Sequence, residues 1–320
     1  MSSLICGSLA FDTIATFDGR FAEHILPDKI HVLNVAFLVP ELRREFGGCA
    51  GNIAYTLKLL GGDPLMLAAL GDDGADYEHR LDELRISRRF VRVVAGSHTA
   101  QAHIVTDRDD NQITSFHPGA MQFAHTQDIP QLPELRLGII APDGRQAMLE
   151  HAAQMAQAGL PFVFDPGQGL PMFDGDELRE FVRQATWVVV NDYEAAMLCT
   201  RTGWSLQQIA TELRGLVVTR GAQGCEVHEG GTCSTVAGVR ASRVVDPTGC
   251  GDAFRGALLW ALEAGWSLPD ACRLGNVLGA RKVACSGPQN HSLDLQQALQ
   301  DMREAYGDVS SGAVGGARAA

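Results

Sequence analysis

The stretch Val244–Phe254, VVDPTGCGDAF, places a run of glycines between the end of a strand and the start of a helix. Glycines at such a junction let backbone N–H groups turn toward a ligand, and the helix dipole adds positive potential there. The sequence therefore predicts an anion-binding turn, and the absence of GxxxxGK[ST] excludes a P-loop NTPase. Asp252 would lie in the first helical turn, where a carboxylate either caps the helix or accepts a proton from an attacking hydroxyl.

Outward from this turn, short apolar runs alternate with helical stretches, which is typical of a parallel sheet covered by helices. The predicted strands are Leu4–Leu9, Leu65–Leu70, Leu137–Ala141, Phe162–Phe164, Trp187–Val190 and Leu216–Thr219. The predicted helices are Gly51–Leu60, Gly74–Leu84, Gly144–Ala158, Asp176–Gln184, Tyr193–Cys199, Gly251–Ala264 and Pro269–Val283. We expect one α/β domain over residues 1–309, followed by a flexible tail over residues 310–320.

Two segments, residues 13–46 and 90–117, interrupt this alternation. The first contains a strand-like piece, His31–Val39. The second reads as two strands, Ala102–Thr106 and Gln112–Phe116, joined by a polar turn. Together they are expected to form a small β lid over one end of the main sheet, which would exclude water during a reaction.

The bulk composition excludes several classes of protein. A net charge of −12 over 320 residues argues against a nucleic-acid or anionic-membrane partner. No run of eighteen apolar residues is present, and the N-terminus lacks the basic segment of a signal peptide. The eight cysteines are scattered, without the spacing of a zinc site. These features favour a cytoplasmic protein with reduced thiols.

Four further patterns are each ambiguous by themselves. A second glycine-rich stretch, Phe46–Gly61 (FGGCAGNIAYTLKLLG), leads into an amphipathic helix. Asp12 follows the first strand and would face the ligand crevice of a parallel sheet, although a turn-forming Asp is commoner. Asn191 and Glu194 open a helix with the spacing of a capping box. The stretch Thr219–Gly224 is alone typical of a hairpin turn.

In this order the motifs resemble ribokinase-like kinases of the phosphofructokinase-B type, over nearly the whole chain from Asp12 to Gly287. The resemblance implies a three-layer α/β sandwich with a mostly parallel sheet and a small β lid. It also implies an ATP-dependent phosphotransferase that uses an alcohol acceptor. Such transfer depends mainly on positioning and on charge stabilisation.

The family's C-terminal motif, D-T-x-G-A-G-D, is similar to Val244–Phe254. In the family the last Asp is the base and the glycine-rich turn is the anion hole. Carried over, Asp252 is the base, and the N–H donors are Gly249, Cys250 and Gly251. This sequence departs from the pattern at Pro247, which follows the first Asp, and at Cys250, which replaces the usual Ala.

The resemblance also assigns the acceptor site. Gly47, Gly48 and Asn52 would lie against sugar hydroxyls, and Asp12 would hold two ribose hydroxyls. The lid offers apolar groups that could face a purine or simply pack within the lid. These groups are Phe37, Leu38, Phe116 and Met121.

On the nucleotide side, the resemblance places the loop of Thr219, Gly221 and Gly224 against the ATP phosphates or ribose. Asn276 is a candidate for lining the adenine pocket, with a buried polar contact as the equal alternative.

The resemblance further implies two cation sites. Asn191 and Glu194 would organise Mg²⁺ and the phosphates, mostly through water. Asp246 and Thr248 match positions that hold a monovalent cation, here expected to be K⁺, and residues near Ala284–Gly287 would complete that site.

The acceptor is predicted from two segments, residues 12–29 and 112–121, which look most like bacterial adenosine kinases. Cys49 also replaces the Lys that sugar kinases of the family often carry. We expect adenosine to be phosphorylated on its 5′-hydroxyl to AMP, a purine-salvage reaction, and a homodimer is one expected assembly. A kinase for ribose or fructose-type sugars is the alternative, and an inactive binding protein is the alternative of another class. An NAD-dependent dehydrogenase is a distant third, because no GxGxxG follows Leu4–Leu9.

Overall fold

The computed structural model describes residues 2–25, 34–109 and 111–307. Within these residues a nine-stranded sheet has the order β13-β12-β11-β10-β9-β8-β1-β4-β5. All its neighbouring pairs are parallel except β11 with β12 and β12 with β13, which are antiparallel. Its strands are β1 (Ser2–Cys6), β4 (Pro64–Leu70), β5 (Val91–Val93), β8 (Leu135–Ile140), β9 (Phe162–Phe164), β10 (Trp187–Asn191), β11 (Gly215–Thr219), β12 (Gly224–Glu229) and β13 (Thr232–Ala237).

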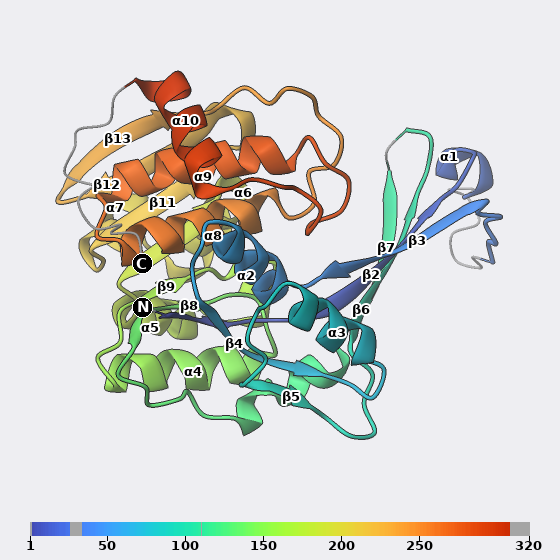
Figure 1. Ribbon diagram of the computed structural model, residues 1–320, viewed down its shortest axis with the longest axis horizontal. Helices are drawn as coiled ribbons and strands as arrows, with labels where there is room; N and C mark the ends of the chain where they lie inside the picture. The colour runs from blue at the N-terminus through green and yellow to red at the C-terminus, as the bar shows by residue number, and fades with distance from the viewer. Residues whose placement is uncertain (1, 26–33, 110, 308–320) are drawn as a thin grey trace.

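Helices cover both faces of this sheet (Figure 1). One face carries α2 (Cys49–Leu59), α3 (Ala75–Glu83), α8 (Cys250–Glu263), α9 (Leu268–Lys282) and α10 (Leu295–Tyr306). The other carries α4 (Arg145–Gln157), α5 (Gly175–Gln184), α6 (Asp192–Thr202) and α7 (Leu206–Thr211). Strand residues alternate between the two cores: Val189 packs in the first, while Val188 and Val190 pack in the second. The result is the predicted three-layer sandwich.

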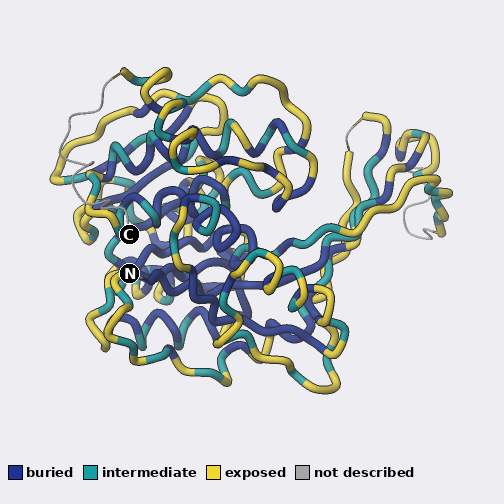
Figure 2. Tube along the Cα trace, in the orientation of Figure 1, coloured by how far each residue is buried: buried dark blue, intermediate teal, exposed yellow. Residues whose placement is uncertain are grey.

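A second sheet of four strands, called here the small sheet, has the order β3-β2-β6-β7. It consists of β2 (Ala10–Thr16), β3 (Glu41–Gly47), β6 (Ala100–Thr106) and β7 (Gln112–His117). The small sheet projects from the body of the molecule, and a short helix, α1 (Phe21–His24), lies at its far end (Figure 1). Much of it is exposed, β7 along its whole length (Figure 2).

Every strand and helix predicted for the main sandwich forms, within three residues at each end. In the small sheet the predicted strands Ala102–Thr106 and Gln112–Phe116 form as β6 and β7, whereas the strand predicted in the first segment is wrong. Residues 31–33 of the predicted strand His31–Val39 lie outside the described residues, residues 34–39 form no strand, and the strand is instead β3. Its charged residues, Glu41 to Glu45, are exposed or half-buried on both faces, so it shows no apolar alternation.

Other elements were not predicted at all. They are the strands β2, β5, β12 and β13 and the helices α1, α7 and α10. The strand β5 pairs with β4 in the main sheet, although it falls within residues 90–117. The described residues also form the 3₁₀ segments η2 (Gly119–Thr126), η3 (Gly167–Met172) and η4 (Gly221–Gln223). In the described part of the chain, the helices are too short or too polar to cross a membrane.

Candidate active site

The predicted anion-binding turn forms the N-terminus of α8. Gly249 is the N-cap with φ 78°, and a Cβ there would lie 2.7 Å from Pro288, so the position requires glycine. The first intrahelical bond is donated by the Ala253 N–H to the Gly249 carbonyl at 2.9 Å. The N–H groups of Gly251 and Asp252 precede that bond and therefore have no acceptor within the helix.

The three predicted anion-hole donors differ in what they contact. The Cys250 N–H donates to the Pro247 carbonyl at 3.1 Å and so closes the turn itself. Gly251 is exposed at the helix start, and Gly249 is half-buried beside it. The exposed N-terminus of α8, with Gly249 and Gly251, is thus the part of the turn that an anion can approach.

Asp252 is connected to the second glycine-rich motif through a chain of hydrogen bonds. Asn52 Nδ2 donates to Asp252 Oδ2 at 2.8 Å. Gln289 Nε2 donates to Asn52 Oδ1 at 3.1 Å and to the Tyr77 hydroxyl at 2.8 Å, and that hydroxyl donates to the Gly47 carbonyl at 2.7 Å. The amide of Asn52 is thereby fixed with its N–H₂ group toward Asp252, which favours an ionised carboxylate at that position.

Asp12, Glu45 and Asp252 form an acidic cluster, in which the other two charges act on Asp12. A Cβ on Gly47 would come within 2.5 Å of Asp12 Oδ2, so the glycine makes room for that carboxylate. Burial, followed by the negative charges of Asp252 and Glu45, raises the pKa of Asp12 to about 6. The structure therefore brings together Asp12, Gly47, Asn52 and Asp252, as the sequence predicted.

A buried arginine lies beneath Asp252. Arg255 forms an ion pair with Asp165, donating from its NH2 group to Asp165 Oδ1 at 2.6 Å, and lies 4.0 Å from Glu194 Oε2. Burial raises the pKa of Asp252, while the charge of Arg255 and the hydrogen bonds of Asn52 and Cys49 oppose that rise. A raised pKa makes Asp252 a stronger base than a solvent-exposed Asp.

The motif at Asn191 and Glu194 forms a complete capping box at the start of α6. Asn191 Oδ1 accepts from the Glu194 N–H at 2.7 Å, and Glu194 Oε2 accepts from the Asn191 N–H at 2.8 Å. Glu194 is also near the Arg255 guanidinium, so this box is electrostatically coupled to the α8 turn. Hard carboxylate oxygens of this kind fit Mg²⁺, which usually keeps several of its own waters.

The loop after β11 is a tight turn. The Arg220 N–H donates to the Gly224 carbonyl at 2.7 Å, and the intervening 3₁₀ turn η4 begins at Gly221. Gly221 and Gly224 have φ values of 53° and 91°. Thr219 donates its hydroxyl to the Val190 carbonyl at 3.4 Å, which ties the loop to β10.

Asn276 makes the polar contact that was the alternative to an adenine-pocket role. Its Nδ2 atom donates to the Ala237 carbonyl at 3.1 Å and to the Tyr306 hydroxyl at 3.2 Å. The side chain therefore connects α9 with the end of β13 and with α10. Its position as an adenine contact stays a prediction.

Strand register places Phe116 on the same face of the small sheet as Asp12. Asp12 is paired with Ala102, and Ala102 is paired with Phe116. The Phe116 side chain is 49% exposed, which suits a ligand contact. The other apolar residues predicted to face a purine do not share this position.

Two of them pack within the protein. Phe37 lies against Phe17 and Phe21, with ring centroids 4.8 and 5.0 Å apart, and Met121 is buried in η2. Leu38 is 87% exposed. Lid packing, the alternative that the sequence left open, thus holds for Phe37.

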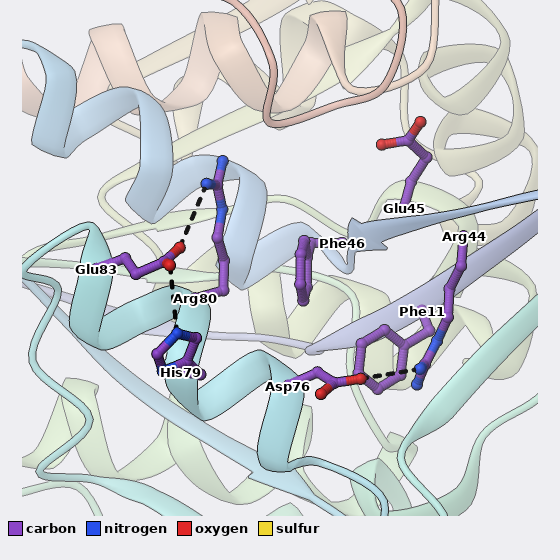
Figure 3. A pocket seen from close by; sticks show the side chains of 8 residues that line it. All are labelled: Phe11, Arg44, Glu45, Phe46, Asp76, His79, Arg80 and Glu83. Carbon is purple, nitrogen blue, oxygen red and sulfur yellow. Dashed lines mark hydrogen bonds and ion pairs between the residues drawn. The ribbon is translucent and has the colours of Figure 1, made fainter.

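A pocket of about 340 Å³ lies beside the opposite face of the small sheet, against α3 (Figure 3). Its lining residues are Phe11, Arg44, Glu45, Phe46, Asp76, His79, Arg80 and Glu83. Because side chains alternate along a strand, Phe11 and Phe46 point away from the face that carries Asp12 and Gly47. None of the predicted site residues lines this pocket, although Glu45, whose charge helps to raise the pKa of Asp12, does.

The residues predicted to hold K⁺ contact groups of the chain itself. Asp246 Oδ1 accepts from the Thr248 N–H at 2.9 Å, and Oδ2 accepts from the Gly287 N–H at 2.8 Å. The Asp246 carbonyl accepts from Lys282 Nζ at 2.8 Å. Burial tends to raise the pKa of Asp246, but these N–H donors and the Lys282 ammonium lower it below its usual value.

Several residues of the site were not found from the sequence. They are Tyr77, Asp165, Arg255, Lys282 and Gln289. The one available signal was Arg255, which follows Asp252 by three residues and so lies near it on the α8 surface. The others reach the site only through the tertiary fold.

Comparison with known proteins identifies the family of the chain. A model of the pfkB family of carbohydrate kinases matches residues 14–295. The solved structure of a Burkholderia thailandensis nucleoside kinase in complex with inosine is 48% identical, with a TM-score of 0.88, over 96% of this chain and 98% of that one. A nucleoside kinase of Methanocaldococcus jannaschii is 27% identical over 82% of this chain and 87% of its own length.

An aminoimidazole riboside kinase of Salmonella typhimurium is 29% identical over 78% of this chain and 86% of its own length. These matches extend over the sandwich and the small sheet alike, and they confirm the resemblance drawn from the motifs. The chain belongs to the pfkB family of carbohydrate kinases and is an ATP-dependent kinase with the ribokinase-like fold.

Proposed function

We propose that this kinase phosphorylates the 5′-hydroxyl of a purine nucleoside, with adenosine as the expected acceptor. The observation that carries the proposal is the bond of 2.8 Å from Asn52 to Asp252, at the N-terminus of α8 and beside Asp12. A base, an anion-binding helix start and a carboxylate suited to a ribose diol thus lie in one place. Similarity to kinases that are named for nucleosides supports the same acceptor class.

In the proposed reaction Asp252 accepts the proton of the 5′-hydroxyl as the oxygen attacks the γ-phosphorus of ATP. The N–H groups of Gly249 and Gly251 would stabilise charge on the transferring phosphoryl group, helped by the dipole of α8. Asp12 would hold the ribose hydroxyls, and Gly47 and Gly48 would lie against the sugar. Asn52 would keep Asp252 oriented for the transfer.

ATP would lie along the α6 and β11 ends of the sheet, near Thr219, Gly221 and Gly224, with Asn276 beside the adenine. Glu194 would help to position Mg²⁺, which offsets phosphate charge when bound. K⁺ has no place in this proposal, because Lys282 contacts the Asp246 carbonyl that the ion would need. A cytoplasmic setting, a homodimer and a role in purine salvage stay predictions.

A nucleoside is preferred over a free sugar because a purine adds apolar contact. Phe116 lies on the Asp12 face of the small sheet and offers that contact. Burying about 100 Å² of purine at about 25 cal/mol per Å² would contribute about 2.5 kcal/mol before ordering costs. Ribose and fructose lack this surface.

Initial rates of ADP release with adenosine, inosine, ribose and fructose test the proposal. We expect kcat/KM for adenosine to exceed that for either sugar by at least about tenfold. The kcat/KM for inosine distinguishes an enzyme that prefers adenosine alone from one that accepts purine nucleosides in general. A sugar that matches or exceeds both nucleosides would contradict the proposal.

A further inference from the structure

Lys282, the last residue of α9, has a fully buried side chain, 0% exposed. Its ammonium group donates to the Asp246 carbonyl at 2.8 Å and to the Cys285 carbonyl at 3.3 Å. It also lies 3.9 Å from Asp246 Oδ1. A buried ammonium is costly unless it is paired, and these three contacts favour its charged form.

These acceptors belong to the two segments where the sequence predicted a monovalent cation, Asp246–Thr248 and Ala284–Gly287. Other groups of the chain occupy the neighbouring oxygens. Arg243 Nε donates to the Ala284 carbonyl at 2.9 Å. The guanidinium of Arg43 is 3.9 Å from Asp246 Oδ2.

A K⁺ ion does not fit this arrangement. It would need a set of carbonyl and carboxylate oxygens of the kind that Lys282 and Arg243 already use. It would also be repelled by the ammonium and by the two guanidinium groups. The donor set is therefore matched to the positive side chains of this chain and not to a free cation.

The contacts of Lys282 lead directly to the anion-binding turn. Asp246 begins the turn, and its carboxylate fixes the Thr248 N–H at 2.9 Å. The turn then closes through the bond from the Cys250 N–H to the Pro247 carbonyl, immediately before α8. The hydrogen bonds and the ion pair of Lys282 go to Asp246 and Cys285 and not to Asp252 or Gly249, so they act on the position of this turn.

We propose that the ammonium of Lys282 is a built-in cation that fixes the anion-binding turn, so that this kinase works without K⁺. This proposal depends on the proposed function only in the tests below that measure reaction rates. Lys282 is a positioning residue, and its removal should leave a site that a small cation can fill.

The unmodified protein gives the first test. Rates of phosphoryl transfer are compared in K⁺, Na⁺ and tetramethylammonium chloride at matched ionic strength. The proposal predicts rates equal within about twofold, because the turn already has its cation. A rate in K⁺ that is at least about tenfold above the rate in tetramethylammonium would overturn it.

The second test uses Lys282→Ala, with Lys58→Ala as the control, since Lys58 lies in the last turn of α2, at the opposite end from Gly48. Without a small cation, Lys282→Ala should lose kcat on the order of 100-fold, with a smaller change in KM. K⁺ or ammonium should restore at least about a tenth of the wild-type kcat, whereas tetramethylammonium should not. Lys58→Ala should match the wild type in every salt.

The melting temperatures of the same proteins give a test that does not depend on kinase activity. K⁺ should raise the melting temperature of Lys282→Ala relative to tetramethylammonium and leave the wild type and Lys58→Ala unchanged. A Lys282→Ala protein that folds but gains neither rate nor stability from K⁺ would show a structural role only and would overturn the proposal. Should no acceptor be phosphorylated, the proposed function fails, and the melts still test the built-in cation.

Discussion

The Asp12 carboxyl group is placed where its negative charge can bind an acceptor but lowers the stability of the fold. Burial and the charges of Asp252 and Glu45 raise its pKa from 3.8 to about 6. Since the folded protein holds this proton more tightly than the unfolded chain, Asp12 stabilises the fold fully below about pH 4, and that contribution is lost as the pH rises through about 6. Above about pH 7 the charged carboxylate therefore costs stability.

Asp12→Asn should remove that cost. We expect the variant to be more stable than the wild type above about pH 7, by about 1–2 kcal/mol, and no more stable near pH 4. Its KM for the nucleoside should rise at least about tenfold, because an amide holds two hydroxyls less well than a carboxylate. Melts across pH and steady-state kinetics measure both effects, with Asp18→Asn as the exposed control. A variant that is destabilised at high pH, with unchanged KM, would rule out this role.

At the scale of single residues, the sequence predicted those whose chemistry is carried by a local motif. Asp252, Asn52 and Asp12 are of this kind, and the structure brings them together. Gln289 and Tyr77 could not be predicted, because their hydrogen bonds join residues 237 and 212 positions apart. A polar residue whose partner lies so far along the chain has no local sequence pattern.

Among the elements, the junction between β3 and α2 depends on a glycine. Gly48 has φ 86°, and a Cβ there would lie 2.5 Å from the Ser8 carbonyl oxygen. Gly61, just after α2, has a similar φ of 81° but no atom within 4 Å of such a Cβ. Comparing the two positions therefore distinguishes the cost of a positive φ, which they share, from the cost of a steric contact, which only Gly48 would have.

Gly48→Ala should cost more stability than Gly61→Ala. In both variants the positive φ should lower the free energy of unfolding by about 1 kcal/mol. Gly48→Ala should lose about 1–3 kcal/mol more, because the backbone near Ser8 has to move. Its KM for the nucleoside should also rise, because α2 carries Asn52. Urea unfolding and kinetics on both variants check this. Equal losses in the two proteins would contradict the proposed close contact.

The strand β7 offers a second matched pair. Phe116 lies on the Asp12 face, whereas Ile113, paired through Val105 with Ala15, lies on the other face. Their side chains are 49% and 43% exposed. Position relative to the acidic cluster is therefore the main difference between them.

Phe116→Ser should raise KM for adenosine at least about tenfold, since it removes apolar contact with the purine. Ile113→Ser should leave KM unchanged within about twofold. Neither variant should alter kcat strongly, because neither side chain contacts the transferring phosphoryl group. Equal KM values in the two variants would remove the small sheet from nucleoside recognition.

Prediction of the elements from sequence succeeded where apolar periodicity is strong. Six parallel strands of the main sheet, which are largely buried, were found within a few residues; they are β1, β4, β8, β9, β10 and β11. The strand β3 was placed too early, because its exposed charged residues carry no alternation. The antiparallel strands β12 and β13 were missed, since β13 is largely exposed and polar.

At the scale of the whole molecule, the small sheet projects from one side of the three-layer sandwich (Figure 1). The chain passes from β1 of the main sheet directly to β2 of the small sheet, and Asp12 lies on the latter. Asp252 lies at the start of α8 in the sandwich. The proposed site is therefore shared between the small sheet and the sandwich.

The central claim is that Asp252 is the base of this transfer and does more than cap α8. Asp252→Asn keeps the size of the side chain and removes the proton acceptor. Asp176→Asn is the matched control, because Asp176 also lies in the first turn of a helix, α5, and is exposed.

The most direct measurement is kcat for adenosine in these two variants, with ATP affinity measured in parallel. Asp252→Asn should lower kcat on the order of 10²–10⁴-fold while ATP affinity and the melting temperature stay close to the wild type. Asp176→Asn should keep the wild-type kcat. A folded Asp252→Asn protein with a kcat near that of the wild type would contradict the account.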